Sequence, residues 1–444
     1  MEQDLTTGSV FKRIVYFSLP YLLSYFLQTL YGMADLFITG QFYGVDTITA
    51  VSNGSQIMHM MTVIIVGLAM GTTVTIGHSV GAKCMEQAEK IIGNTITLFM
   101  GIAVAFTVIL VVLVKPIVVL IATPQEAVAG TSIYLLICFI GIPFITAYNI
   151  ISSIFRGLGD SKSPMYFIGI ACVMNIALDY LFMGAFHMGA AGAALGTVCA
   201  QTFSVLVALW VIRRRKTGIS LKKSDFKIET AVIGQVLKIG IPVALQDGFI
   251  QVAFMIITVI ANSRGVSDAA AVGVVEKVIS ALFIVPSSML ATVSALSAQN
   301  LGAGKEKRAT DTLHYATVIT TIYGMIVAVI IQFIAENVVG IFTSDTTVVT
   351  MGSAYIRSYI WDCIFAGIHF SFSGYFAACG KSYIGFLHNI ISITFVRVPG
   401  SYLASKYFTD TLYPMGLAAP AGSLVSVAIC VTAFILLKRK SRVA

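Results

Sequence analysis

Charged residues are scarce in this chain: only 11% of its 444 residues are Asp, Glu, Lys or Arg. An average soluble domain carries about 25% of them, and a single soluble core stops growing near ~250–300 residues. Hydrophobic residues make up 57% of the chain, and its mean hydropathy is +0.90. So much apolar surface excludes a cytosolic globular enzyme, a nucleic-acid-binding protein and a secreted disulfide scaffold. The solvent for most of the chain must be a lipid bilayer.

The chain also lacks the motifs that catalysis requires. It has no GxSxG, Walker A, HExxH or DxxD-type diphosphate motif, and no soluble region that could house an ATPase. Its six histidines are scattered without the spacing of metal ligands. We therefore expect neither an enzyme nor a primary pump, and no bound cofactor.

Paired cysteines and a cleavable signal are missing as well. The seven cysteines are odd in number, contain no CxxC pair and lie almost entirely in apolar runs. That pattern is typical of small buried hydrophobic side chains rather than disulfides or metal sites. Lys12 and Arg13 lead into an apolar run that is too long for the core of a signal peptide. We expect this first span to remain in the mature protein.

Long apolar runs are what the sequence does contain. A helix that spans a bilayer needs about 20 predominantly apolar residues. Reading the runs between polar or Gly/Pro breaks gives twelve candidates. The predicted fold class is therefore all-α and integral to the membrane, with twelve transmembrane helices. Their approximate limits are 14–38, 48–77, 91–114, 130–154, 165–185, 190–212, 233–260, 272–298, 313–334, 350–376, 384–404 and 415–437.

The distribution of basic residues predicts the orientation. Most of the 28 Lys and Arg residues lie in one alternating set of loops, whereas the opposite loops hold only Arg264 and Lys406. Because cytoplasmic loops are enriched in basic residues, this bias places both termini in the cytoplasm. That result requires an even number of spans, which twelve satisfies. The net charge of +8 is explained by the same orientation.

The two halves of the chain resemble each other. Pro20 matches Pro242, and Leu181 matches Leu403 at the same separation. Six spans are an even number, so both halves insert in the same direction, as parallel six-helix repeats with a substrate path between them. The alternative is a twelve-helix protein whose repeats only pack. The predicted regions are a cytoplasmic segment 1–13, an N-lobe 14–212, a basic cytoplasmic linker 213–232, a C-lobe 233–437 and a basic cytoplasmic tail 438–444.

Two acids stand inside spans of the first half. Asp35 lies on span 1 with Tyr31 and Gln28 on the same helical face, and Asp179 lies on span 5 one turn after Asn175. Ionisable groups in a bilayer are costly, so they indicate function. Two carboxylates in a poorly solvated pocket cannot both ionise cheaply. Such a pocket holds a proton or binds a small cation such as Na⁺, unless each acid merely bonds a neighbouring helix.

The second half is polar in a different way. At the repeat spacing Asn175 corresponds to Arg397, and the acid pair is not duplicated. The charged residues within the spans of the second half either neutralise one another in a structural ion network or contact substrate directly. The candidates for this substrate pathway, beyond Gln28 and Tyr31, are Gln246, Asp247, Gln251, Lys277, Asp362, His369 and Arg397. Glu276 lies beside Lys277 on the same span.

These features together resemble the MATE (multidrug and toxic compound extrusion) family. The resemblance runs from Ile14 to the end of span 12. It is carried by the two repeats, the span-1 string LPYLLSYFLQTLYGMADLFITG, the VGAK and LGAG turns, and FRGLGDSKSP. Pro20, Gln28 and Asp35 are similar to the pattern of the family's first helix.

The match is closer to the branch that resembles DNA-damage-inducible protein F than to the NorM branch. The first branch implies a cluster that responds to protons or cations, and Asp35, Asn175, Asp179 and Thr197 match its members. The same four residues are then the candidates for a Na⁺ site. The NorM pattern has a glutamate on helix 7 and an aspartate on helix 10. Here Ile250 and Gln251 stand near the first position, and Asp362 lies too early for the second.

The resemblance implies a secondary active exporter in the cell membrane. It would antiport amphiphilic, often cationic, organic compounds against H⁺ or Na⁺ by alternating access, and we expect a monomer. One alternative is a flippase for lipid-linked oligosaccharide, which would need several Arg or Lys residues to hold a diphosphate. Another is an integral-membrane transferase, which would need an acid/base or metal motif. Uncoupler-sensitive dye efflux from cells would favour the exporter.

Overall fold

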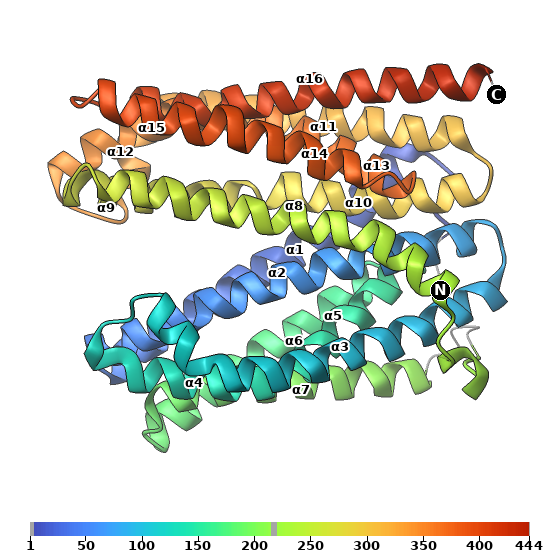
Figure 1. The fold of residues 1–444 in the computed structure, drawn as a ribbon, viewed down its shortest axis with the longest axis horizontal. Coiled ribbons are helices and arrows are strands. Elements are labelled where there is room, and N and C mark those ends of the chain that lie inside the picture. The colour runs from blue at the N-terminus through green and yellow to red at the C-terminus, as the bar shows by residue number, and fades with distance from the viewer. Residues whose placement is uncertain (1–3, 215–219, 444) are drawn as a thin grey trace. The chain divides into compact units, whose positions relative to one another are not determined.

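The computed structural model describes residues 4–214 and 220–443, with the side chains of 440–443 left out. Parts of the predicted segment 1–13, linker 213–232 and tail 438–444 lie outside these residues. The described chain is built of helices without strands (Figure 1). It divides into two compact units. Unit 1 comprises 1–6, 16–240 and 302–304, and unit 2 comprises 7–15, 241–301 and 305–444.

Within residues 4–214 the chain forms seven long or medium α-helices. They are joined by short turns, one 3₁₀ helix (η1) and one π-helix (η2), and a 3₁₀ turn (η3) precedes the second half. The elements are α1 (Val10–Phe42), α2 (Val45–Gly81), α3 (Met85–Leu120), η1 (Gln125–Ala127), α4 (Val128–Ile140), α5 (Ile142–Gly157), α6 (Lys162–Asp179), η2 (Tyr180–Ala185), α7 (Gly189–Arg214) and η3 (Lys223–Phe226).

Residues 220–443 continue the pattern with nine more α-helices. A second π-helix, η4, lies between two of them. The elements are α8 (Thr230–Asn262), α9 (Val266–Leu282), α10 (Ile284–Gly302), α11 (Glu306–Gly340), α12 (Thr346–Tyr359), α13 (Asp362–Ala378), α14 (Tyr383–Ser392), η4 (Ile393–Arg397), α15 (Val398–Tyr407) and α16 (Tyr413–Val443).

These helices account for the twelve predicted spans one by one, which confirms the all-α membrane fold. Spans 4, 8, 10 and 11 are each made of two α-helices, α4–α5, α9–α10, α12–α13 and α14–α15. Within the described residues, eight helices are long and apolar enough to cross a membrane, or nine when α4 and α5 count as one bent span. The other three segments are α1, α12–α13 and α14–α15, which carry more polar residues or shorter helices.

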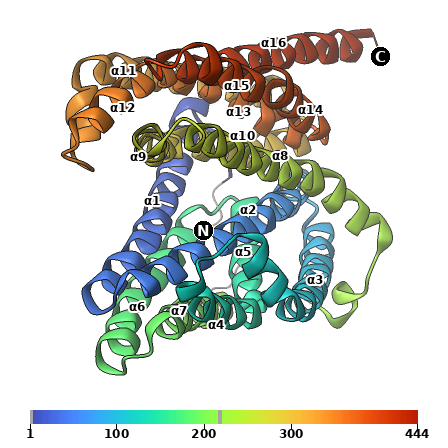
Figure 2. The ribbon, with the colours of Figure 1, turned by 60° about the vertical axis from the view of Figure 1, so that its left-hand side comes forward.

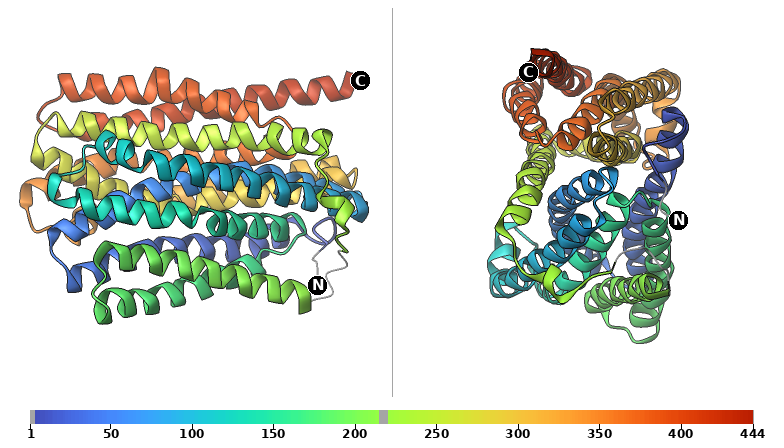
Figure 3. Two further views of the ribbon diagram at one scale, coloured as in Figure 1. Left: turned by 60° about the horizontal axis from the view of Figure 1, so that its bottom comes forward. Right: turned by 90° about the vertical axis from the view of Figure 1, so that its right-hand side faces the viewer.

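The two units repeat the same helix packing. In unit 1 the fourth span packs on the second, third and sixth: α4 contacts α2, α3 and α7. In unit 2 the equivalent helix α12 contacts α9, α11 and α16. Figure 2 shows α4 beside α7 and α12 beside α11. Figure 3 shows the helices of each unit running alongside one another. The duplication seen in sequence is thus also a duplication of structure.

Proline explains some of the helix breaks. Pro143 stands at the start of α5, directly after a bend of 51° between α4 and α5, and Pro399 stands at the start of α15. A proline has no N–H to donate, so it is tolerated in the first turn of a new helix. Pro20 and Pro242 lie inside the continuous helices α1 and α8. Both fifth spans contain a π-helix instead, η2 and η4, a geometry that often accompanies functional sites.

Apolar side chains form the interior of each unit. In unit 1 one cluster centres on Tyr134, Leu135 and Phe139 of α4, all nearly inaccessible. In unit 2 the equivalent cluster centres on Tyr355 and Ile356 of α12. Four cysteines are buried as predicted, but the prediction is wrong for two, which are exposed. Cys84 lies in a turn before α3, and Cys199 faces outward from α7.

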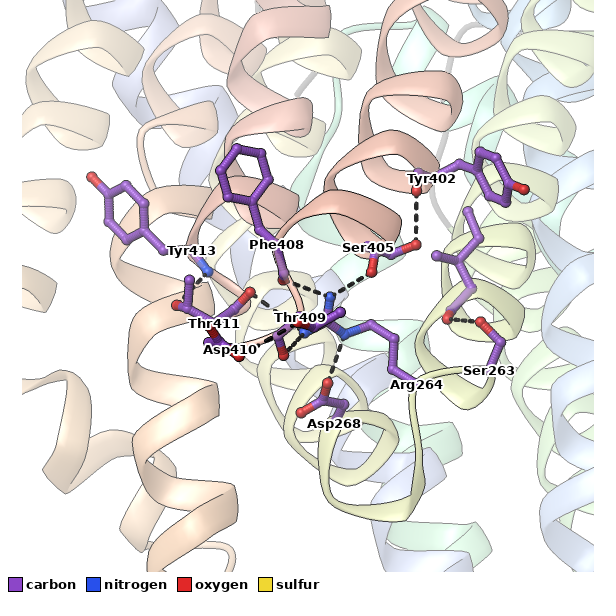
Figure 4. A network of polar contacts seen from close by, with 11 residues as sticks. Ser263, Arg264, Asp268, Tyr402, Ser405, Phe408, Thr409, Asp410, Thr411 and Tyr413 are labelled. Atoms are coloured by element: carbon purple, nitrogen blue, oxygen red, sulfur yellow. Dashed lines mark hydrogen bonds and ion pairs between the residues drawn. The ribbon is translucent and has the colours of Figure 1, made fainter.

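A polar clasp joins two turns of unit 2 (Figure 4). Arg264, after α8, donates Nε–H to Asp268 Oδ2 at 2.6 Å. The other guanidinium nitrogens donate to the backbone carbonyls of Ser405, Phe408 and Thr409 at 2.9 Å, and to that of Thr411 at 3.5 Å. A planar guanidinium suits several acceptors at once. Arg264 is one of the two basic residues in the loops that are otherwise poor in Lys and Arg, and these contacts give it a structural role.

Candidate functional site

Asp35 and Asp179 lie in one buried cluster of unit 1, with exposed fractions of 3% and 0%. Thr197 of α7 donates its hydroxyl to Asp35 Oδ2 at 3.3 Å. Asn175 donates its amide Nδ2 to Asp179 Oδ1 at 3.4 Å. The carboxyl groups of Asp35 and Asp179 lie within electrostatic range of each other. Helices α1, α6 and α7 therefore bring all four predicted coupling residues together.

Local sequence positions these side chains. Asn175 and Asp179 are one helical turn apart, so they share a face of α6. Asp179 is its last residue, and the π-helix η2 follows directly. On α7, a side-chain carbon at Gly196 would collide with Asp179 Oδ1 and would lie 3.6 Å from Asn175 Nδ2. The absence of a side chain at Gly196 thus makes the room that the carboxyl group occupies.

The cluster has more hydrogen-bond acceptors than donors. Asp35 Oδ1, Asp179 Oδ2 and Asn175 Oδ1 are buried without a hydrogen-bond partner in the described structure. Neither acid forms an ion pair with a Lys or Arg of the described residues. Buried acceptors that lack a donor are costly. A proton shared by the two carboxyl groups would supply the missing donor and would remove one of the two charges.

Two further residues of α4 close the cluster. Tyr134 and Cys138 are buried and lie within electrostatic range of Asp35. Tyr31, one turn before Asp35, places its hydroxyl near Thr197 and Asp35. Gln28 is half-buried, and no hydrogen bond between it and the cluster is seen in residues 4–214. Sequence analysis did not single out Tyr134, because a tyrosine in an apolar run gives no signal of its own.

The donor set is compatible with a small cation as well as a proton. Two carboxyl groups, the amide oxygen of Asn175 and the hydroxyl of Thr197 are all hard oxygen ligands, the type that hard cations prefer. Because three of the oxygens lack a hydrogen-bond donor, they are free to coordinate. The geometry therefore fits exchange of a single positive charge, H⁺ or Na⁺.

Unit 2 buries a second charged cluster around Arg397, which ends the π-helix η4. Its guanidinium donates to the hydroxyl of Tyr359 and lies 4.9 Å from the ring centroid of Phe254. Its acidic partners are Asp362, 1% exposed, and Glu276, whose Oε2 accepts from Thr258 at 3.3 Å. Both oxygens of Asp362 lack a hydrogen-bond donor. Among the described residues Arg397 makes no ion pair with either acid at 4 Å or less, so the three charges act on one another over longer distances inside one unit.

A third polar group lies on α8, α13 and α14 of unit 2. Ser373 Oγ and His388 Nε2 are 2.9 Å apart, and the rings of His369 and His388 have centroids 5.3 Å apart. Gln246 is 1% exposed, and its Oε1 would be 2.7 Å from a side-chain carbon at Gly385. Sequence analysis named Gln246 and His369 but missed His388, because nothing in the chain shows that α13 and α14 bring the two rings together.

The structure does not bring the remaining candidates into these groups. Asp247 and Gln251 are half-buried, and Lys277 is exposed. Among the described residues, no ion pair or hydrogen bond ties their side chains to Arg397 or Asp362. Adjacent residues on a helix point about 100° apart. This is why Glu276 faces Arg397 while Lys277 does not.

A family model described as MatE matches the chain twice, over residues 20–181 and 242–403. Both matches begin at a proline inside the first helix of a half, Pro20 and Pro242, and end at Leu181 and Leu403. Together they cover well over half of the chain. The duplication predicted from sequence is therefore confirmed.

Known proteins resemble the chain over nearly its full length. A probable multidrug resistance protein of Bacillus subtilis, YpnP, is 30% identical over 415 residues, 93% of this chain and 93% of that protein. The multidrug export protein MepA of Staphylococcus aureus is 23% identical over 374 residues, 84% of this chain and 82% of its own length. The solved outward-facing structure of a multidrug resistance MATE family transporter matches with TM-score 0.91 and 20% identity, covering 99% of each chain.

Proposed function

We propose, from the premise that this chain belongs to the MatE family, that it exports amphiphilic and often cationic organic compounds from the cell. That family is one of transporters, not of enzymes. The names of the relatives, a probable multidrug resistance protein and a multidrug export protein, support this substrate class. We place the chain in the cell membrane as a monomer with both termini in the cytoplasm, because the basic residues favour that orientation.

The coupling site of the proposed antiport is the pair Asp35 and Asp179. The observation that carries it is that both acids are buried together, each with a carboxyl oxygen that lacks a hydrogen-bond donor. A proton from outside would bind between them and remove one negative charge. An organic cation attracted by the ionised pair would then lose that attraction and leave. Drug and proton need only compete for the same carboxyl groups, so no long-range coupling is required.

The neighbouring side chains have distinct parts in this scheme. Thr197 donates to Asp35 and Asn175 to Asp179, so each holds its acid in place. Both donors stabilise the ionised form, because a hydrogen bond to a carboxylate favours the charge. Tyr31 and Gln28 extend from the same face of α1 and are candidates for contact with the drug.

We assign the charged cluster of unit 2 to structure rather than to coupling. Arg397 supplies a fixed positive charge that acts on Asp362 and Glu276, so one of the two acidic charges can be balanced within the unit. Asp35 and Asp179 have no such partner among the described residues. That contrast supports coupling in unit 1.

The decisive experiment is transport in proteoliposomes under imposed gradients. An outside-acid pH gradient and an inward Na⁺ gradient, applied separately, should show which ion drives export of an ethidium-like dye. We expect Asp35→Asn and Asp179→Asn each to remove the dependence on the driving ion. The control is Glu336→Gln, which changes an exposed acid with a side chain that is 66% accessible. Ion-driven export that persists unchanged in Asp35→Asn would contradict the coupling scheme.

A further inference from the structure

The chain between α7 and α8 combines basic and apolar side chains that face solvent. We call residues 220–229 the linker strap. Lys222, Lys223 and Lys227 are all exposed. Beside them, Leu221, Phe226 and Ile228 are 40%, 39% and 62% exposed, although they lie outside the helices that span the bilayer. Large apolar side chains exposed on a loop indicate an interaction surface.

The strap is held in a fixed position along α3. Asn94 donates its amide to the carbonyl of Asp225 at 3.1 Å and accepts from the backbone N–H of Glu229 at 2.7 Å. Thr97 donates to the carbonyl of Phe226 at 3.0 Å. A side-chain carbon at Gly93 would collide with the Asp225 carbonyl, so the two backbones are in contact. Figure 2 shows this segment, in yellow-green, running along α3.

This attachment places the strap at the level of the lipid headgroups. Thr97 lies about 18 Å along α3 from its first residue, at about 1.5 Å per residue. Between Lys90 and Lys115 α3 carries no charged residue, and Thr97 lies about 9 Å into this stretch from Ile91, at about 1.5 Å per residue. The carbonyl of Phe226 is therefore bound in the outer turns of the apolar region, not out in the aqueous phase.

Acidic groups near the strap are already engaged. The carboxyl group of Asp225 is buried and accepts from the backbone N–H of Lys222 at 2.7 Å. Glu89 accepts from the backbone of Ser220 at 2.6 Å, and Glu86 pairs with Lys90 at 3.5 Å. The side chains of Glu86 and of Glu229, at the end of the strap, are exposed. The three lysines form no ion pair within the described residues.

We propose that the linker strap binds anionic phospholipid headgroups, with its lysines on the phosphate charges and its apolar side chains in the upper acyl region. Basic segments next to a membrane gain affinity for anionic lipid with each added lysine. Apolar side chains in the same segment insert into the boundary between headgroups and acyl chains. Three lysines and three apolar side chains within eight residues of a fixed segment fit that partner. The inference does not rest on the proposed transport function.

The test uses the full chain in vesicles with a reporter in the strap. Phe226→Trp, placed in a Trp210→Phe, Trp361→Phe background, reports quenching by brominated phosphatidylglycerol or brominated phosphatidylcholine. We expect preferential quenching by the anionic lipid. Replacing Lys222, Lys223 and Lys227 by Gln should weaken that preference roughly a hundred-fold, from about five-fold per lysine. High salt should weaken it too.

Control variants distinguish lipid binding at the linker strap from a general effect of the protein's positive charge. Replacing Lys305, Lys307 and Lys381 by Gln removes the same charge elsewhere and should leave quenching in the strap unchanged. Leu221→Ser with Ile228→Ser should reduce quenching by both lipids. An excess of inorganic phosphate should not displace the lipid, because phosphate has no acyl chains. Equal quenching by the two lipids, or a preference that survives the triple Gln variant, would overturn the proposal. Unchanged thermal unfolding of each variant excludes misfolding as the cause.

Discussion

Gly196 on α7 lies directly against the carboxylate of Asp179 at the end of α6. Helices can approach this closely because glycine has no side chain. The pair therefore links the packing of two helices to the position of an acid.

Gly196→Ala should inactivate transport without changing any charge. The new methyl group would collide with Asp179 Oδ1 and must displace the carboxyl group that accepts from Asn175. Overpacking of this kind costs about 1–3 kcal/mol, and we expect ion-coupled dye export to fall at least ten-fold. Initial rates in proteoliposomes measure it. Gly101→Ala is the matched control, because nothing lies within 4 Å of that position. Equal activity in the two variants would refute the steric argument.

Thr197→Val should change the pH dependence of export. Thr197 donates to Asp35 at 3.3 Å, and loss of a hydrogen bond to a charged group costs about 1.5–3 kcal/mol. Without this donor the carboxylate takes up a proton more readily. The pH at which export is half-maximal should therefore rise by about one to two units, since one unit corresponds to about 1.4 kcal/mol. Thr197→Ser keeps the hydroxyl and should keep the wild-type profile. A profile that does not move in the Val variant would argue against proton binding at this site.

Arg264→Lys should destabilise unit 2. The guanidinium binds Asp268 and several backbone carbonyls at once, and its side chain is only 7% accessible. An ammonium group cannot reach all of these acceptors. We expect a loss of about 3 kcal/mol or more, seen as a lower midpoint in thermal unfolding. The comparison is Arg357→Lys, which alters a more exposed ion pair with Glu336 at 3.3 Å and should cost less than about 1 kcal/mol.

Arg397→Met should leave Asp362, which is buried, and Glu276, which is half-buried, without the positive charge of Arg397. Breaking a close buried ion pair costs about 3–5 kcal/mol, and removing this more distant charge should cost less but still lower thermal stability. Adding Asp362→Asn to that variant should restore part of it, because the remaining charge is then smaller. A double-mutant cycle measures this coupling. If instead Arg397→Met leaves stability intact and changes the KM for dye, Arg397 contacts substrate and our structural assignment fails.

The sequence was a reliable guide wherever the signal was local. Apolar run length located all twelve helical segments, although helices such as α3 and α11 extend up to seven residues beyond the predicted limits. The one-turn spacing of Asn175 and Asp179 predicted their contact. Both are properties of a single helix, so no knowledge of packing was needed.

The sequence did not predict which side chains of different helices contact one another. The steric role of Gly196 depends on how closely α6 and α7 approach, and the pairing of His369 with His388 depends on α13 and α14. Lys277 was grouped with Arg397 by charge alone. The packed helix instead turns Glu276 inward and leaves Lys277 exposed. Charge and spacing do not specify which face of a uniformly apolar helix meets its neighbour.

The π-helix after Asp179 has a consequence for the rest of span 5. A π turn holds one more residue than an α turn. Deleting a single residue between Tyr180 and Ala185 would remove that extra residue and let the span relax into a regular α-helix, whereas the same deletion elsewhere in the span would rotate everything beyond it by about 100°. The carbonyl of Met183, which accepts from the hydroxyl of Tyr43 at 3.0 Å, lies within this turn. Span 5 is thus a helix that should tolerate the loss of one residue better in this turn than anywhere else along its length.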